Sequence, residues 1–196
     1  MPKITDAHRE SRRDQILDAA LACFAERGFQ ATSMADIIAA SGLSAGAIYL
    51  YFAGKRDIAL AVARRTMATR AGELAARAQA GDALSPSAMI RTVSASLERD
   101  GIGTGLILQL WGEAATDPTF FDIVGEALAA LGDQFVGALA NWATQARGMD
   151  AADARAWATD VLPVMLALGQ GYMVQRTLMP DFDLERYLAG VERVLG

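Results

Sequence analysis

Hydrophobic residues recur at intervals of three and four along most of this chain, and no segment alternates with the period of two that is typical of a half-buried strand. The clearest stripe lies between positions 121 and 142 and consists of Phe121, Val124, Leu128, Leu131, Phe135, Ala138 and Trp142. Such spacing gives a helix one apolar face and leaves the other faces to solvent. We therefore expect an all-α fold of about nine helices.

Polar residues and glycines mark where several of these helices begin and end. Ser33 and Asp36 have the spacing of a capping box, and Ser44 can cap the short helix that follows. Gly28 and Gly148 stand where a helix would end on a left-handed residue. The signals predict helices over about 11–27, 33–40, 45–51 and 55–80, one starting at Pro86, one around 106–111, and others over about 118–147, 150–178 and 184–195.

The eighth expected helix contains a proline. Pro163 has no amide hydrogen, so the carbonyl of Thr159 would lose its partner and the helix should bend near that residue. The sequence leaves open whether Pro163 kinks this helix or splits it.

Charge is divided unevenly along the chain. The net charge is −5, but residues 1–70 hold 10 Lys and Arg against 7 Asp and Glu, whereas residues 71–196 hold 8 against 16. A basic N-terminal region on an acidic body can approach a polyanion with that region only. A chance fluctuation would look the same, so charge alone does not decide.

The rest of the composition excludes several kinds of site. A single cysteine, Cys23, rules out a disulfide framework and is expected in the core, and one histidine, His8, leaves little for imidazole chemistry. No acidic or histidine cluster has metal-ligand spacing, so we expect no metal and no cofactor. The N-terminus is polar, and no apolar run reaches the roughly 18 residues of a membrane span. We expect a cytoplasmic protein without a membrane partner.

Three helices near the N-terminus form a helix-turn-helix pattern. The last two are short and are joined by residues 41–44, where Gly42 allows the sharp turn and Leu43 fills the angle between the helices. Ile37 and Ile48 would pack on the first helix. The second short helix is then presented outward at a size that enters the DNA major groove.

The segment from Gly28 to Phe52, with its Ile48-Tyr49-Leu50-Tyr51-Phe52 core and the Lys55 that follows, resembles the DNA-binding domain of the TetR family of transcriptional regulators. The resemblance covers about residues 11–60. It implies a DNA-binding domain over residues 1–57 and a ligand-binding and dimerisation domain over residues 58–196. It also implies a transcriptional regulator, most often a repressor, that binds double-stranded DNA at a palindromic operator as a homodimer.

The resemblance assigns DNA contacts to particular positions. The residues expected to contact the phosphate backbone are Thr32, Ser33, Ser44, Tyr49, Tyr51 and Lys55. The resemblance places toward the base edges Ala45, Gly46, Ala47, Tyr49 and Leu50, while Arg12 and Arg13 would add minor-groove or phosphate contacts. Family members commonly carry polar residues where this chain has Ala45, Ala47 and Leu50. Readout here would rest on thymine methyl groups and DNA shape.

Apolar residues on several C-terminal helices suit a cavity for a small apolar effector. The candidate lining residues are Met67, Met89, Leu106, Leu110, Trp111, Phe121, Leu128, Phe135, Met165 and Met173. Glu113, beside Trp111, could stand at the wall and favour a cationic ligand. An ordinary hydrophobic core explains any one of these residues equally well.

The last two helices suggest a second buried face. The eighth is apolar nearly all round and the ninth is too short to be stable alone, and the family resemblance implies a dimer through these helices. The expected interface residues are Trp157, Val161, Val164, Leu168, Tyr172, Leu184, Tyr187, Leu188 and Val191.

Two other functions are weighed. Residues 42–46 match the G-x-S-x-G nucleophile elbow with Ser44 as the nucleophile, but a helix precedes them and the only histidine, His8, comes earlier in the chain, so we reject a hydrolase and expect no enzyme. A ligand-binding or scaffold bundle without specific DNA readout stays open, because three residues of the expected recognition helix are apolar.

Overall fold

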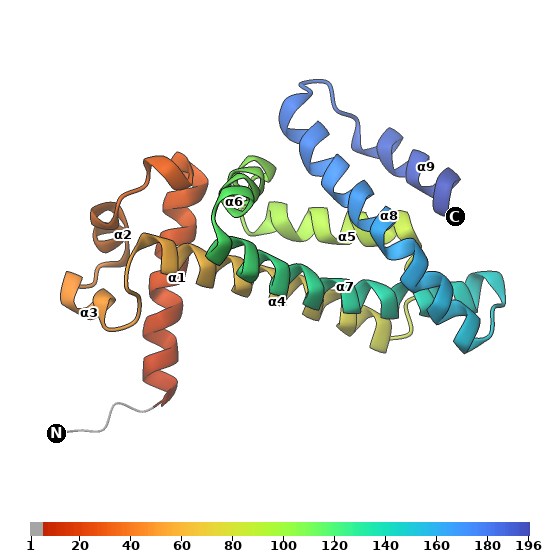
Figure 1. Ribbon diagram of the computed structural model, residues 1–196, viewed down its shortest axis with the longest axis horizontal. Helices are drawn as coiled ribbons and strands as arrows, with labels where there is room; N and C mark the ends of the chain where they lie inside the picture. The colour runs from red at the N-terminus through yellow and green to blue at the C-terminus, as the bar shows by residue number, and fades with distance from the viewer. Residues whose placement is uncertain (1–5) are drawn as a thin grey trace.

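The computed structural model describes residues 6–196, and within that range the chain forms nine helices and no strand (Figure 1). This confirms the all-α fold. The helices are α1 (Asp6–Ala31), α2 (Met34–Ser41), α3 (Ala45–Tyr49), α4 (Lys55–Gln79), α5 (Pro86–Arg99), α6 (Thr104–Thr116), α7 (Pro118–Arg147), α8 (Ala151–Leu178) and α9 (Leu184–Leu195).

Helices α1, α2, α3 and the start of α4 form an N-terminal head around a shared core. Ile16, Ile37, Ile48 and Ile58, one from each of these helices, are fully buried there, and Cys23 lies in the same cluster as expected. In Figure 1 the head stands at one end of the molecule, with α1 crossing the start of α4. Because α4 continues from the head into the body, the predicted boundary at residue 57 falls inside a continuous helix.

The expected helix ends are largely confirmed, with small corrections. Gly28 interrupts α1 with a φ of 79° and a ψ of 164°, which is a glycine-specific extended conformation and not the expected left-handed helix end, and a further short helical segment continues α1 to Ala31. Helix α1 starts at Asp6 rather than near residue 11, and α3 ends at Tyr49 rather than Tyr51. The serine caps and the proline start of α5 all have the predicted geometry.

The body is built on α4, α7 and α8, with α5, α6 and α9 packed around them (Figure 1). Its core contains Leu74, Met89, Leu139 and Met165, all almost fully buried. Helix α9 lies against α5, where Glu185 accepts two hydrogen bonds from the Arg91 guanidinium. The buried Leu188, Val191 and Leu195 hold this short helix against the body, and the exposed ion pair adds little to them.

Helix α8 runs without a break from Ala151 to Leu178 with Pro163 inside it, so the proline does not split the helix. None of the helices in residues 6–196 combines the length and apolar character needed to cross a membrane.

Candidate nucleic-acid interface and apolar cavity

Helix α3 lies at the outer edge of the head, away from the body (Figure 1). The Ser44 hydroxyl caps it by accepting a hydrogen bond from the Ala47 amide at 3.2 Å. Ala45 and Gly46 are exposed in its first turn, and Leu50, just after its end, is 80% exposed. The helix therefore presents its N-terminus and an apolar outer face to solvent, as the sequence predicts.

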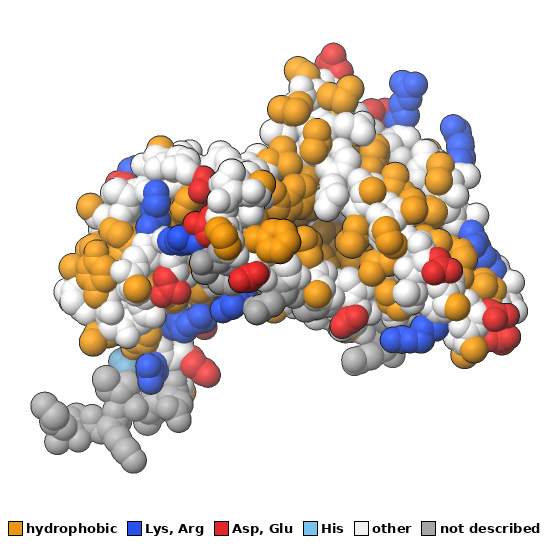
Figure 2. Space-filling view, viewed as in Figure 1, with side chains coloured by type: hydrophobic (Ala, Val, Ile, Leu, Met, Phe, Trp, Pro, Cys, Tyr) orange, Lys and Arg blue, Asp and Glu red, His pale blue; other side chains and the backbone are white. Residues whose placement is uncertain are grey.

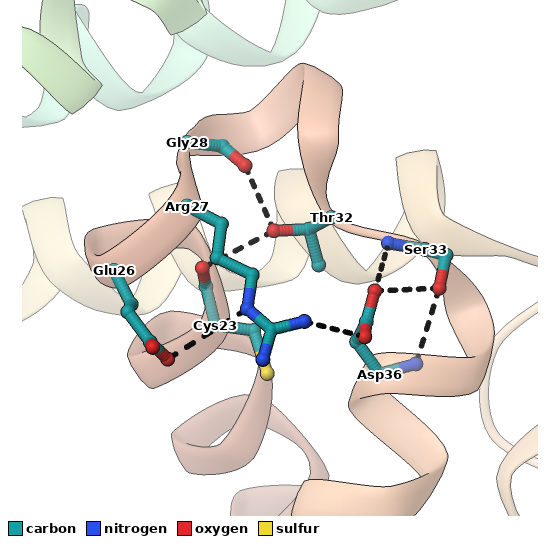
Figure 3. A network of polar contacts seen from close by, with 7 residues as sticks. All are labelled: Cys23, Glu26, Arg27, Gly28, Thr32, Ser33 and Asp36. Carbon is teal, nitrogen blue, oxygen red and sulfur yellow. Dashed lines mark hydrogen bonds and ion pairs between the residues drawn. The ribbon is translucent and has the colours of Figure 1, made fainter.

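A network of polar contacts fixes the connection between α1 and α2 (Figure 3). The Asp36 carboxylate accepts hydrogen bonds from the amide and hydroxyl of Ser33, and the Ser33 hydroxyl accepts one from the Asp36 amide, which completes the capping box. Arg27 donates to the other Asp36 oxygen at 2.6 Å. The Ser33 hydrogen bonds, followed by Arg27, hold the pKa of Asp36 below its ordinary value. The orientation of α2 is thus locked.

Thr32 is not a phosphate contact, which corrects the sequence-based assignment. Its side chain is only 1% exposed, and its hydroxyl donates to the carbonyls of Gly28 at 2.8 Å and Cys23 at 3.1 Å (Figure 3). A buried hydroxyl with both contacts inside the chain cannot reach DNA. Thr32 instead closes the end of α1.

Lys55 is engaged within the head. Its ammonium group donates to the carbonyls of Phe29 at 2.9 Å and Gln30 at 3.2 Å and lies over the Phe29 ring. The structure thus gives Lys55 a structural role, and its expected phosphate contact would have to use the remaining N–H. Tyr51 packs partly against the head core, whereas Tyr49 is exposed.

The two arginines of α1 also have contacts inside the head. Arg12 donates to the Gln15 side chain, which in turn donates to the Ser41 carbonyl at the end of α2. Arg13 lies over the Phe52 ring. Contacts of these arginines with DNA stay a prediction.

Head and body meet where α6 and the start of α7 contact residues 29–30. The Phe29 amide donates to Gln109 at 3.0 Å, and the Gln30 side chain donates to Glu113. The Phe29 ring also contacts Phe120 edge-on. Glu113 is therefore a junction residue rather than part of a cavity wall, so the expectation of a cationic ligand held by Glu113 is wrong.

An apolar cavity of about 70 Å³ lies inside the body. Six candidate residues line it, namely Met67, Trp111, Leu128, Phe135, Met165 and Met173. Leu106 and Leu110 line a second cavity of about 50 Å³, which shares Met67, Ile107, Trp111 and Leu128 with the first. Two assignments are wrong, because Met89 is fully buried elsewhere in the core and Phe121 is 67% exposed on the surface.

Arg70 is a cavity residue that the sequence analysis missed. It lines the larger cavity, is only 1% exposed, and donates to Asp100 at 2.7 Å. A signal was present: Arg70 follows Met67 by three positions and precedes Leu74 by four, so it continues the apolar stripe of α4. Isolated arginines in long helices are usually exposed, and this one is not.

The expected dimer surface is partly corrected. Tyr172, Leu188 and Val191 are buried in the core of the chain itself and cannot meet a partner. The Tyr187 hydroxyl donates to the Leu168 carbonyl, which commits it to packing between α9 and α8.

Other apolar side chains of the last two helices stay on the surface. Val164 is exposed, Val161, Leu168 and Leu184 are half-buried, and Leu178, which is not among the expected interface residues, is 69% exposed. Trp157 is half-buried because its ring packs on Trp142 of the same chain. This exposed part of α8 remains the candidate interface.

Comparison with known proteins connects the head to a family. Residues 16–62 match the family model described as bacterial regulatory proteins, tetR family, which covers α3 and both of its flanking turns. The head therefore resembles the DNA-binding region of TetR-family regulators. The HTH-type transcriptional regulator YfiR of Bacillus subtilis is 40% identical over 57 residues, and the HTH-type transcriptional repressor Rv1474c of Mycobacterium tuberculosis is 42% identical over 64.

These sequence matches are local. They cover 29% and 33% of this chain and 28% and 34% of the two relatives, so the chain matches about a third or less of the length of each. Over nearly the full length the likeness is one of fold. A regulator from Saccharomonospora viridis whose structure contains choline has a TM-score of 0.70 at 20% identity, with 94% of this chain and 95% of that chain covered. The fold of this regulator thus matches the chain over both the head and the body.

Proposed function

We propose that this protein is a DNA-binding transcriptional regulator of the TetR family, acting as a repressor, that binds a palindromic operator as a homodimer and responds to a small molecule bound in its body. The observation that carries the proposal is the outward presentation of a capped α3 within the segment that matches the family. A relative that is a transcriptional repressor supports the direction of regulation.

The exposed face of α3 favours an unusual mode of DNA reading. Ala45, Ala47 and Leu50 offer methyl groups, which can contact thymine methyl groups in the major groove. The helix carries no Arg, Asn or Gln, so it lacks the bidentate base contacts that are worth about 1–3 kcal/mol each. Affinity per half-site should be modest, and binding by two linked heads becomes essential.

Dimerisation is proposed through the exposed side of α8. Val164, Leu168, Gln175 and Leu178 lie four, seven and three positions apart, which places them along one seam of this helix, beside the groove between α8 and α9 that Leu168 and Gln175 also line. Val164 and Leu178 are exposed in the single chain. A helix face of this kind is stable in water when a second copy covers it.

The two cavities offer a route from ligand to DNA. The smaller one is lined by Leu21 of α1, Val62 of α4 and Leu110 of α6, so it reaches the elements of the head. On another side of α6, Gln109 and Glu113 hold residues 29–30. A ligand that displaces α6 would therefore shift the head and weaken DNA binding. By thermodynamic reciprocity, bound DNA would lower the affinity for the ligand by the same factor.

Selection of binding sites from a random duplex library, at near-physiological salt, tests the function. We expect an enriched palindrome with half-sites about one helical turn apart. Enrichment of no sequence, with binding that only falls as salt rises, would contradict specific regulation and favour the second candidate, an α-helical ligand-binding bundle without DNA readout. The apolar face of α3 is the observation that keeps this second candidate in view.

A further inference from the structure

The larger cavity is lined by a buried guanidinium group, that of Arg70, and the chain provides hydrogen-bond acceptors for only part of it. Arg70 donates from Nη2 to Asp100, but its Nε and Nη1 have no hydrogen-bond partner among the described residues. A guanidinium group has five N–H donors, and leaving buried donors unpaired is costly. Such an arrangement is expected where a ligand supplies the missing acceptors.

The surroundings of Arg70 define what that ligand should be. The other described residues that line the cavity carry no charge and are mainly hydrophobic, and Figure 2 shows hydrophobic side chains gathered in a hollow between α6 and α8. A guanidinium group binds carboxylates with matched geometry and strong charge-assisted hydrogen bonds. An anionic head and an apolar body therefore fit this cavity.

We propose that the ligand is an alkyl or arylalkyl carboxylate whose carboxylate group binds Arg70, an inference that rests on the proposed ligand-responsive function. The apolar part lies against Phe135, Met165 and Met173 and extends past Met67 into the smaller cavity. Methionine is unbranched and flexible, so rotation of the Met67 side chain can join the two spaces.

The dimensions suggest a chain of moderate length. Arg70, which lines the larger cavity, and Val62, which lines the smaller one, are separated by about 12 Å along α4 at 1.5 Å per residue. An eight-carbon chain spans a comparable length. Its far end would contact Leu21 and Val62, which belong to the head core or pack against it.

Three probes of equal length separate the contribution of charge from that of apolar contact. We would titrate octanoate, octanol and octylamine into the full-length protein by isothermal titration calorimetry. Octanoate should bind about 10-fold or more tightly than octanol, as expected for a hydrogen bond to a charged group, and octylamine should bind most weakly. Equal or tighter binding of octanol or octylamine, or no binding of any probe by the folded protein, overturns the proposal.

Variants at two arginines locate the effect. Arg70→Met should remove the preference for octanoate over octanol while leaving octanol binding within about twofold, because methionine preserves the apolar wall. Arg99→Met is the matched control, since it removes an arginine of α5 that pairs with Glu73 of α4 outside the cavity, and it should bind like the wild type. A preference that survives in Arg70→Met contradicts the assignment, and if that variant does not fold, the three-probe comparison on the wild type decides alone.

Failure of this inference and failure of the proposed function have different signatures. If octanoate binds through Arg70 but leaves operator affinity unchanged, the ligand chemistry stands and ligand-responsive regulation fails. If the protein selects an operator but does not distinguish octanoate from octanol, regulation by DNA binding stands and the anionic ligand is wrong.

Discussion

Thr32 and Ser33 stand side by side in the sequence, yet the fold gives their hydroxyl groups different partners. Thr32 turns inward and binds two carbonyls at the end of α1, whereas Ser33 is exposed and caps α2. Sequence analysis places both on DNA, because a motif gives position along the chain but not the direction of a side chain. The packing of α1 on α2 determines which of the two side chains points inward and which is exposed.

Replacement of Thr32 by valine tests its structural role. Thr32→Val keeps the volume and removes the hydroxyl, so it should lower the free energy of unfolding by roughly 1–3 kcal/mol, with Thr32→Ser as a control that keeps the hydroxyl. Chemical denaturation measures the change. Unchanged stability together with weaker DNA binding would restore Thr32 as a phosphate contact.

Cys23 gives a second test at the residue scale. Burial raises the pKa of its thiol, and the thiolate is the reactive form. The native protein should therefore react with a thiol reagent at neutral pH far more slowly than the denatured protein. Equal rates in the native and denatured states would show that the face of α1 that carries Cys23 is not buried.

The residues that sequence analysis identifies correctly are those whose roles are local. Ser33, Ser44, Ser85 and Asp150 cap helices through bonds to amides two or three positions away, and such bonds leave a signature in the sequence. Arg70 was missed because its burial depends on which helices surround α4. Helix caps and apolar core positions are readable from the sequence, whereas the burial of a charged residue such as Arg70 depends on how the helices pack around it.

At the scale of the element, the capping box of α2 makes a prediction about pH. The Asp36 pKa is lowered, first by the Ser33 side chain, so this carboxylate stabilises the fold above the ordinary aspartate pKa of about 4, and that stability is lost as pH falls through the lowered value. In Ser33→Ala the pKa of Asp36 should rise toward the ordinary value. NMR titration of the carboxyl carbons measures the Asp36 pKa in the wild type and in Ser33→Ala.

Asp150 is the internal control in that titration. Its pKa is lowered by the backbone amide of Asp153, in a different helix cap, and should not respond to Ser33→Ala. An Asp36 pKa that stays low without the Ser33 hydroxyl would mean that the Ser33 amide and Arg27 are sufficient to lower it.

Element lengths and types were predicted better than their surfaces. The apolar periodicity of α7 and the long run of α4 identified both helices, because each buries a stripe along its whole length. The nearly all-round apolar character of α8 indicated two buried faces but not which residue faced which neighbour. Tyr172 was therefore assigned to a partner chain although it packs against Phe182 and Tyr187 of its own chain.

At the scale of the whole molecule, dimerisation through α8 makes a prediction about mass in solution. Leu178→Glu and Val164→Glu each place a charge on the exposed seam and should shift the protein from dimer to monomer at micromolar concentration, with helical content unchanged. Sedimentation velocity measures the mass. Phe121→Glu, on an equally exposed apolar residue of α7, is the matched control and should remain dimeric.

If both α8 variants sediment as dimers, the interface lies elsewhere. The exposed Met179 and Val194, which line the groove between α8 and α9 together with Leu168 and Gln175 of the seam, would then be the next side chains to test.

The central claim is that the apolar face at α3 reads DNA sequence. The most direct measurement is the affinity for the selected operator and for a scrambled duplex at one salt concentration, compared between the wild type, Leu50→Ala and Phe121→Ala. Leu50→Ala should lower the preference for the operator by about 1 kcal/mol per half-site and leave scrambled binding unchanged, since phosphate contacts are untouched. Phe121→Ala should match the wild type. An unchanged operator preference in Leu50→Ala would contradict reading by this apolar surface.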